Sequence, residues 1–471
     1  MKSAFSRHTL YSIALLATSL LFYGFFAIYD GAVICVDSPS YINMHISREP
    51  LYPIFLSVLR HIFSDGTDFY LTVAAFLQSI LAAFAAFILT DYLRKELKLS
   101  LVISYIILAF PLATSLLCRF AAKRSPMYSN SILTEGIACS LFLIFFRYLF
   151  EYCLHQTKKS LIMSGLLSFV MIATRKQMYL TLFLLIICIL FVSLKSHCLK
   201  KGILTLILCT FSILACNFAL ENAYIYAVHG SAGTHSSDNR FLATMVFYTA
   251  EKEDFQHIEE ENLRILSEEI YDICDTSGYV KHSAGKGWYN RVTHFGDYYD
   301  CIQIDTMWPA IERYVNDHYT GDSVTLEKQV DAVTNEIIGA VLPHVWTKVL
   351  ATFADNFLSG LITTVAQRRP ILILYTVFIY FIYITLLLNQ IIKKKFSPIL
   401  LFSILTLFSI VINVSIVSAV IFCQTRYTIY NMPLFYISLI LLILQSSRFF
   451  PKCSQADFFP NLDAVLNQWY Y

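Results

Sequence analysis

Ten stretches of apolar residues dominate the sequence. A helix needs about 20 apolar residues to cross the roughly 30 Å hydrocarbon layer of a membrane. Windows near this length are 11–29, 69–91, 100–118, 131–150, 160–174, 178–194, 202–220, 371–392, 397–423 and 428–446. The apolar core of the first window is too long for a signal peptide, and no A-x-A cleavage site follows it. We therefore expect this segment to be retained as a span. The sequence therefore predicts an all-α polytopic membrane protein with about 10 transmembrane helices.

Charge is distributed unevenly between these windows. Residues 222–345 carry 20 acidic and only 8 basic side chains, whereas the rest of the chain has 27 bases and 13 acids. The pattern divides the chain into a membrane region (1–221) with seven spans, an acidic extracytoplasmic segment (222–370), and a second membrane region (371–471) with three spans and a cytoplasmic tail. The acidic segment has no basic patch interleaved with aromatic residues, which argues against a nucleic-acid partner.

The distribution of Lys and Arg predicts the orientation. With the N-terminus inside, the inner connections hold fifteen bases and the short outer connections hold eight. Both termini are then cytoplasmic and the acidic segment lies outside, an arrangement that suits a bacterial inner membrane. Residues 346–366 are half-apolar, and a span there would move the lysines at 393–395 outside. We expect an interfacial helix, with a packing helix of the segment as the alternative.

The acidic segment is too long for a simple connection and needs structure of its own. Residues 253–274 place apolar side chains near helical spacing, so the segment is expected to be largely helical. The stretch 278–300 reads as irregular. Cys274 and Cys301 can form a disulfide there if the compartment is oxidising.

Several sequence signatures of nucleotide and metal chemistry are missing. The chain has no phosphate-binding G-x-x-x-x-G-K-[ST], no G-x-G-x-x-G, no G-x-S-x-G and no H-E-x-x-H. It also has no D-x-D tripeptide that would hold a metal and a nucleotide-sugar diphosphate. We therefore expect no cofactor and no metal site, and a lipid-carried donor suits the chain better than a nucleotide.

Two acidic residues stand out at the predicted outer surface. Asp37 follows the first span, where burial at the edge of the hydrocarbon layer would raise its pKa unless a cation offsets it. That position suits a general base. The alternative interpretation is that Asp37 is an ordinary solvated residue of the loop. Glu135 begins the fourth span, where an acid either caps the helix or has a partner in the site.

A set of basic residues also lies on the predicted outer side, against the usual bias. A phosphate group on a polyprenyl lipid would explain them, because Arg binds phosphate oxygens bidentately and Lys acts as a point charge. Each one alone is more simply a contact to lipid headgroups or a helix cap. The members after the first outer loop are Arg119, Lys123, Arg124, Arg175, Lys176 and Arg426.

These residues occur within recognisable motifs. The acid Asp37 is followed by R-E-P-L-Y-P at 48–53, and L-T-E-G at 133–136 stands at a span entrance. The combination resembles the membrane glycosyltransferases of the GT-C superfamily, in the bacterial branch akin to protein O-mannosyltransferases and the lipid A aminoarabinose transferase. T-R-K-Q-M-Y near 175 and Q-T-R-Y-T-I-Y-N-M-P near 426 are similar to weaker Arg-centred patterns of that branch. Protein O-mannosyltransferases have an Asp-Glu doublet in the first loop, whereas here Ser38 follows the acid, which argues against a protein acceptor.

The resemblance implies a GT-C-like fold and a specific activity. The enzyme would move a sugar from a polyprenyl-phosphate donor to a hydroxyl acceptor, a glycan, lipid or envelope polymer, on the extracytoplasmic face of the bilayer. Asp37 would accept the proton of the acceptor, and Glu135 would orient the sugar or a basic partner. The implied substrate-binding residues are Arg48, Tyr52, Arg175, Lys176, Arg426 and Tyr427, together with Arg119, Lys123 and Arg124.

Two other functions remain open from the sequence. An O-antigen-type polymerase also joins lipid-linked sugars at the outer face, and it would depend more on arginines than on an aspartate base. A transporter or lipid flippase would place ionisable residues near span centres and would show symmetric halves with Gly or Pro breaks. Here the span centres are nearly free of charge. The transferase is therefore the preferred prediction.

Overall fold

The computed structural model of the chain describes residues 7–63, 67–121, 127–231, 233, 239–393 and 396–447, without the side chains of 7 and 118–121. Within these ranges the regular elements are helices, besides one isolated bridge between Val33 and Ser131. The elements are α1 (Arg7–Asp30), α2 (Ser38–Ile42), α3 (Leu51–Phe63), α4 (Phe69–Glu96), α5 (Leu101–Ala121), η1 (Tyr128–Asn130), α6 (Glu135–His155), α7 (Lys158–Ile172), η2 (Lys176–Met178), α8 (Tyr179–Lys195), α9 (Leu199–His229), α10 (Asn239–Thr249), η3 (Lys252–His257), α11 (Glu261–Thr276), η4 (Lys281–Ala284), α12 (Trp288–Asp300), η5 (Cys301–Met307), α13 (Trp308–His318), α14 (Ser323–Val365), α15 (Pro370–Ile392), α16 (Pro398–Val420), α17 (Thr425–Thr428) and α18 (Met432–Ser446).

Eight helices of the described ranges are long and apolar enough to cross a membrane. They are His8–Asp30, Phe69–Glu96, Glu135–His155, Lys176–Lys195, Leu199–His229, Ser323–Val365, Pro370–Ile392 and Pro398–Val420. The prediction of an all-helical membrane protein is confirmed at this level. Seven of the eight match predicted windows. The windows 100–118 and 428–446 correspond to shorter apolar helices, and 160–174 overlaps the 15-residue α7.

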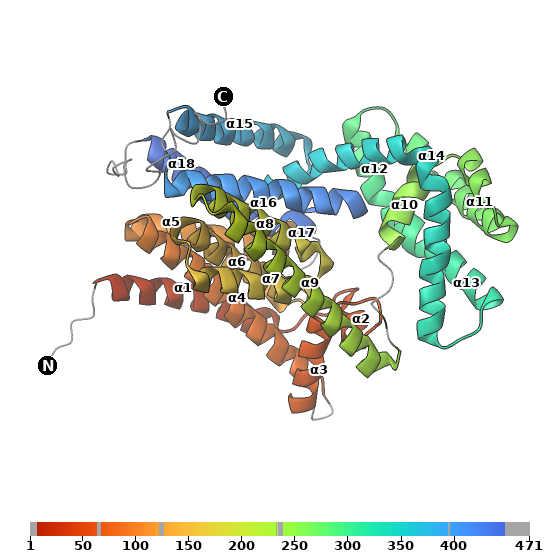
Figure 1. Ribbon diagram of the computed structural model, residues 1–471, viewed down its shortest axis with the longest axis horizontal. Helices are drawn as coiled ribbons and strands as arrows, with labels where there is room; N and C mark the ends of the chain where they lie inside the picture. Colours follow the sequence, from red (N-terminus) through yellow and green to blue (C-terminus); the bar gives the residue numbers. More distant parts are fainter. Residues whose placement is uncertain are drawn as a thin grey trace.

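The long apolar helices form a bundle, and the acidic segment forms a separate group of helices at one end of it (Figure 1). Aromatic rings pack between helices of the bundle. Phe146 and Phe150 of α6 both meet the ring of Phe402 of α16 edge to face, with centroids 5.3 and 5.2 Å apart. All three side chains are fully buried. Because α6 and α16 are far apart in sequence, this contact joins the two membrane regions into one core.

The eighth candidate span, α14, was not among the predicted windows. It is 43 residues long and includes the stretch 346–366, for which we expected an interfacial helix. Pro343 lies inside it, where a missing N–H bends a helix, and Figure 1 shows α14 changing direction on its way from the acidic segment to the bundle. Its last turns press on α16 at Gly360, where a Cβ atom would lie 2.4 Å from Val414 and 2.9 Å from Cys423.

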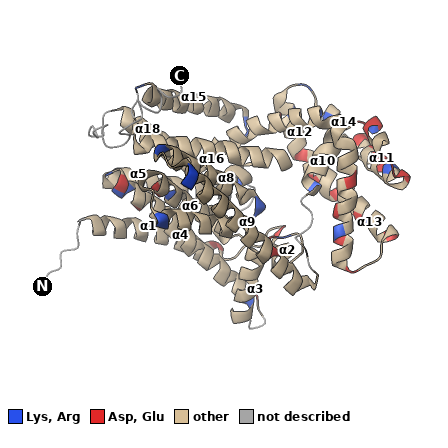
Figure 2. Cartoon of the chain, viewed as in Figure 1, with Lys and Arg blue, Asp and Glu red and all other residues tan. Residues whose placement is uncertain are grey.

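The acidic segment has a hydrophobic core of its own. Helices α10 to α13 and the first half of α14 bury residues such as Phe247, Phe255 and Tyr299 together. Acidic side chains gather on α11, α13 and α14, as Figure 2 shows. The stretch expected to be irregular instead contains η4 and α12, so that expectation is wrong. Cys274 and Cys301 carry free thiols.

Candidate functional site

The segment between α1 and α3 is tied to the segment that precedes α6. Val33 N–H donates to Asn130 O at 2.9 Å, and Ile132 N–H donates back to Val33 O at 3.0 Å. The Ser38 hydroxyl donates to Ile132 O at 2.8 Å. These bonds hold Asp37, which precedes α2, beside Glu135, which begins α6.

A second connection brings the basic residues to the same place. Leu51 N–H, at the start of α3, donates to Ala173 O at 3.0 Å, in the turn that carries Arg175. Pro50 and Pro53 flank this point, and proline is tolerated in the first turn of a helix because no intrahelical N–H bond is lost there. The loop of Arg48 therefore meets the loop of Arg175 although the two are more than a hundred residues apart.

Glu135 is the buried centre of the site. Its side chain has no solvent exposure. Arg175 Nη1 lies 2.7 Å from Glu135 Oε1, and Arg426 Nε donates to the same oxygen. Thr134 Oγ1 lies 3.3 Å from the other oxygen. The carboxylate therefore fixes two arginines from opposite ends of the sequence, rather than only capping α6.

Asp37 is the accessible acid of the site. Its carboxylate accepts a hydrogen bond from Arg426 Nη2 at 3.0 Å and lies 3.5 Å from Arg48 Nη2. About a third of the side chain (32%) is exposed. It makes no capping bond to α2. Arg48 is itself positioned by Ser40 Oγ at 2.8 Å and lies 4.5 Å from the centre of the Tyr41 ring.

In direct contact, the cluster brings three guanidinium groups to two carboxylates. Arg48, Arg175 and Arg426 share the two carboxylates of Asp37 and Glu135. Burial opposes the charge on Arg175 and Arg426, but the Glu135 carboxylate more than offsets this and raises the pKa of both. The arginines thus stay charged.

Tyr427 and Lys176 border this cluster. The Tyr427 ring centre lies 5.4 Å from the Arg175 guanidinium and 5.9 Å from that of Arg426. Lys176 contributes its backbone N–H to Glu49 Oε1 at 2.9 Å. Gln177 Nε2, next along the chain, donates to Tyr427 O at 2.7 Å and so links the two loops.

Tyr52 lies beneath the site rather than in it. It is fully buried, and its hydroxyl donates to Gln78 Oε1 at 2.8 Å. Gln78 Nε2 in turn donates to two backbone oxygens of the segment before α6, each at 3.0 Å. Gly136 leaves room for this amide, because a Cβ atom there would lie 2.6 Å from Gln78 Nε2. Tyr52 therefore supports the loop that positions Glu135. The remaining predicted basic side chains, Arg119, Lys123 and Arg124, lie outside the described residues.

The acidic segment contributes a residue that the sequence did not single out. Asp300 ends α12, and partial burial, followed by the charge of Asp37, raises its pKa. Tyr299 beside it is anchored to the end of α16, where its hydroxyl donates to Val420 O at 3.1 Å. Nothing in the sequence spacing connects residue 300 with residue 37, so only the folded chain reveals this neighbour.

We expect the raised pKa of Asp300 to appear in the stability of the protein. Between the ordinary and the raised pKa of Asp300, the folded state binds more protons than the unfolded state, so stability falls as pH rises. Asp300→Asn removes this cost. The variant should melt above wild type at about pH 7.5, and the difference should vanish near pH 4, close to the unperturbed value of an aspartate. Asp297→Asn on the same helix is the control, and an equal gain in that variant would contradict the assignment.

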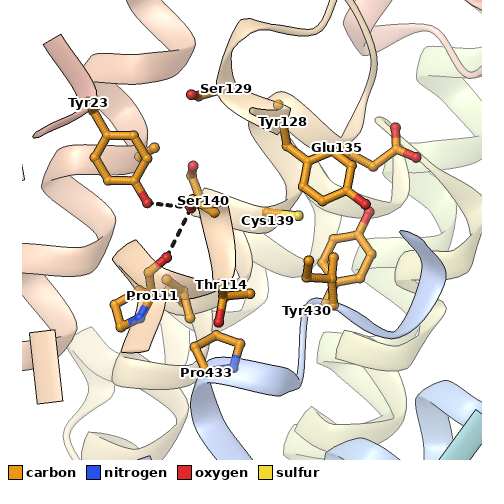
Figure 3. Close-up of a pocket in the computed structure, with 15 residues that line it drawn as sticks. Tyr23, Pro111, Thr114, Tyr128, Ser129, Glu135, Cys139, Ser140, Tyr430 and Pro433 are labelled. Atoms are coloured by element: carbon orange, nitrogen blue, oxygen red, sulfur yellow. Dashed lines mark hydrogen bonds between the residues drawn. The ribbon is translucent and has the colours of Figure 1, made fainter. Parts of the chain in front are cut away.

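A narrow pocket of about 50 Å³ lies between α1, α5, α6 and α18, with Glu135 in its lining. Its other lining residues include the apolar Pro111, Leu143 and Pro433 and the hydroxyl-bearing Thr114 and Ser140. Figure 3 shows Tyr23 on one side of it and Glu135, Tyr128 and Tyr430 on the other. Glu135 is thus the residue that the pocket lining and the charged cluster share.

Comparisons with protein families and with curated proteins gave no match. It matches no protein-family model, and no curated protein is significantly similar to it. Among the described residues, no group of three or more His, Cys, Asp and Glu side chains is placed to hold a metal ion. The site itself must therefore carry any functional argument.

Proposed function

We propose that the chain is a membrane glycosyltransferase that moves a sugar from a polyprenyl-phosphate donor to a hydroxyl acceptor, with a site of the GT-C kind. The single observation that carries the proposal is the cluster of three arginines, Arg48, Arg175 and Arg426, around the partly exposed Asp37 and the buried Glu135. A polyprenyl-phosphate sugar is a phosphodiester with one negative charge, which guanidinium groups bind well. The first atoms of its chain would enter the pocket and the rest would remain in the bilayer.

The chemistry follows from the two acids. The acceptor oxygen attacks the anomeric carbon, the bond from that carbon to the phosphate oxygen breaks, and the polyprenyl phosphate leaves with the electron pair. Asp37 takes the proton of the attacking hydroxyl. Arg48 and Arg426 stabilise the charge that develops on the departing phosphate, as other fixed cations do at transferring groups. Glu135 is a positioning residue, because it holds Arg175 and Arg426 without being exposed.

The contact between Asp37 and its arginines also suggests an order of events. In the free protein Arg426 and Arg48 bind Asp37. A donor phosphate competes for the same guanidinium groups, since arginine pairs with phosphate as well as with carboxylate. Binding of the donor would then release Asp37 to meet the acceptor hydroxyl.

The experiment is transfer of a radiolabelled sugar from polyprenyl-phosphate donors in proteoliposomes. Arg48→Gln should raise the donor KM about tenfold, because a charge-assisted contact to the phosphate is worth about 1.5–3 kcal/mol, with a smaller change in kcat. Arg60→Gln is the matched control, since Arg60 on α3 contacts Ile42 O and Tyr70 rather than Asp37. No donor consumption by wild type, across donors of different sugars, would overturn the proposal.

A further inference from the structure

A second charged cluster lies at the opposite end of the bundle, between α1 and α4. Asp91 accepts a hydrogen bond from Arg94 Nη2 at 2.7 Å and from Lys95 Nζ at 2.6 Å. Ser12 Oγ donates to the same carboxylate at 2.8 Å. Asp91 and Arg94 have 9% and 2% of their side chains exposed, whereas Lys95 has 57%. The buried pair is therefore internal to the fold, and Lys95 is the part that faces outward.

The cluster carries a positive charge that its own acid cannot offset. Arg94 already neutralises Asp91, so the charge of Lys95 is in excess. Arg94 Nη1 also contacts His8 Nδ1 at 3.4 Å. A guanidinium only donates hydrogen bonds, so Nδ1 accepts here, and the neutral ring has its proton on Nε2. The cluster thus offers an ammonium group and a ring N–H.

These groups line a groove with a polar end and an apolar end. The cavity between α1 and α4 measures about 340 Å³ and is lined by His8, Ser12 and Lys95 and by Ile13, Leu16 and Phe87. Both helices place the charged residues at the end of the bundle and the apolar ones one to two turns further in. Figure 1 shows α1 and α4 side by side here, with the N-terminal end of α1 far from α2 and α3.

We propose that this groove binds an anionic phospholipid, with the phosphate against Lys95 and His8 and the start of an acyl chain on Ile13, Leu16 and Phe87. The polar-to-apolar order follows that of a lipid standing in one leaflet. A cationic choline or ethanolamine group would meet Lys95 without a free carboxylate, because Asp91 is already paired. The end of the bundle concerned is the one rich in Lys and Arg, which an anionic leaflet attracts. The site is separate from the proposed transferase centre and stands independently of it.

The test is lipid binding to the full-length protein, measured by native mass spectrometry in detergent. The probes are phosphatidylglycerol and phosphatidylcholine with identical acyl chains. Wild type should bind phosphatidylglycerol at least about fivefold more tightly, and Lys95→Gln should remove most of that preference, since one basic group near an anionic surface is worth about fivefold in affinity. Lys158→Gln, an exposed lysine at the start of α7, is the matched control and should keep the preference.

Further arms of the experiment separate the occupant from simpler explanations. Leu16→Trp should fill the apolar end and weaken binding of both lipids, while the Asp91–Arg94 pair and the melting temperature stay unchanged. An equal loss of preference in Lys158→Gln would mean diffuse charge attraction and would overturn the groove. Displacement of bound phosphatidylglycerol by millimolar inorganic phosphate would point to a free phosphate ligand and would overturn the lipid assignment.

Discussion

Replacing Asp37 by Asn should reduce sugar transfer by about 10²–10⁴-fold, the range that a positioned general base contributes. The amide oxygen can still accept the hydrogen bond from Arg426, so the loop should keep its place. The amide cannot take the proton of the acceptor hydroxyl, so kcat should fall while the donor KM changes little. Initial rates in proteoliposomes at saturating donor measure this directly.

The matched control for this variant is Asp68→Asn. Asp68 lies exposed before α4 and makes no side-chain capping bond. Its replacement should leave transfer at the wild-type rate. Wild-type kcat in the Asp37 variant would remove that residue from the role of base. In that case the proposed phosphate site would still be tested by the Arg48→Gln variant.

Glu135→Gln should cost about 3–5 kcal/mol of folding free energy, the penalty for breaking a buried ion pair from one side. The change leaves the guanidinium groups of Arg175 and Arg426 buried beside a neutral amide. Because those arginines come from distant parts of the sequence, their loops should separate and transfer should be lost as well. Unfolding followed in detergent by circular dichroism gives the stability change.

A double variant distinguishes charge balance from simple loss of packing. Glu135→Gln combined with Arg175→Gln removes one charge of each sign. It should be more stable than the sum of the two single changes predicts, by about 0.5–3 kcal/mol for residues in direct contact. Additive effects, or a Glu135 variant as stable as wild type, would contradict the central role of this carboxylate.

The helical class and the positions of most long helices were predictable from local sequence. An apolar window must satisfy its backbone hydrogen bonds internally, so its composition alone favours a helix. The length of α14 was harder to predict, because Lys348, Asp355 and Asn356 interrupt its apolar character. Asp355 pairs with Arg291 at 2.6 Å, and Asn356 donates to Ile421 O at 2.6 Å. Partners outside the helix therefore make these polar residues compatible with it.

In the acidic segment, too, one helix was predictable from local sequence and another was not. Helical spacing in 253–274 predicted helical structure there, where α11 lies, since an amphipathic period is a local property. The helix α12 was missed because its glycine and aromatic residues suggested a loop. Tyr299 and Phe295 of α12 are buried in the core of the segment. Tertiary packing of those rings thus outweighs the weak local preference.

At the site, the residue types and their places near span ends follow from the sequence. Charged residues cannot lie at span centres without high cost, so Asp37, Glu135 and the arginines had to cluster near span ends. Their partners were not predictable from the sequence. Arg426 contacts Glu135 across 291 positions and Asp37 across 389. Folding also places Tyr52 below the site and Asp300 near Asp37. Pairings at such separation depend on how the helices pack, and local periodicity does not determine that packing.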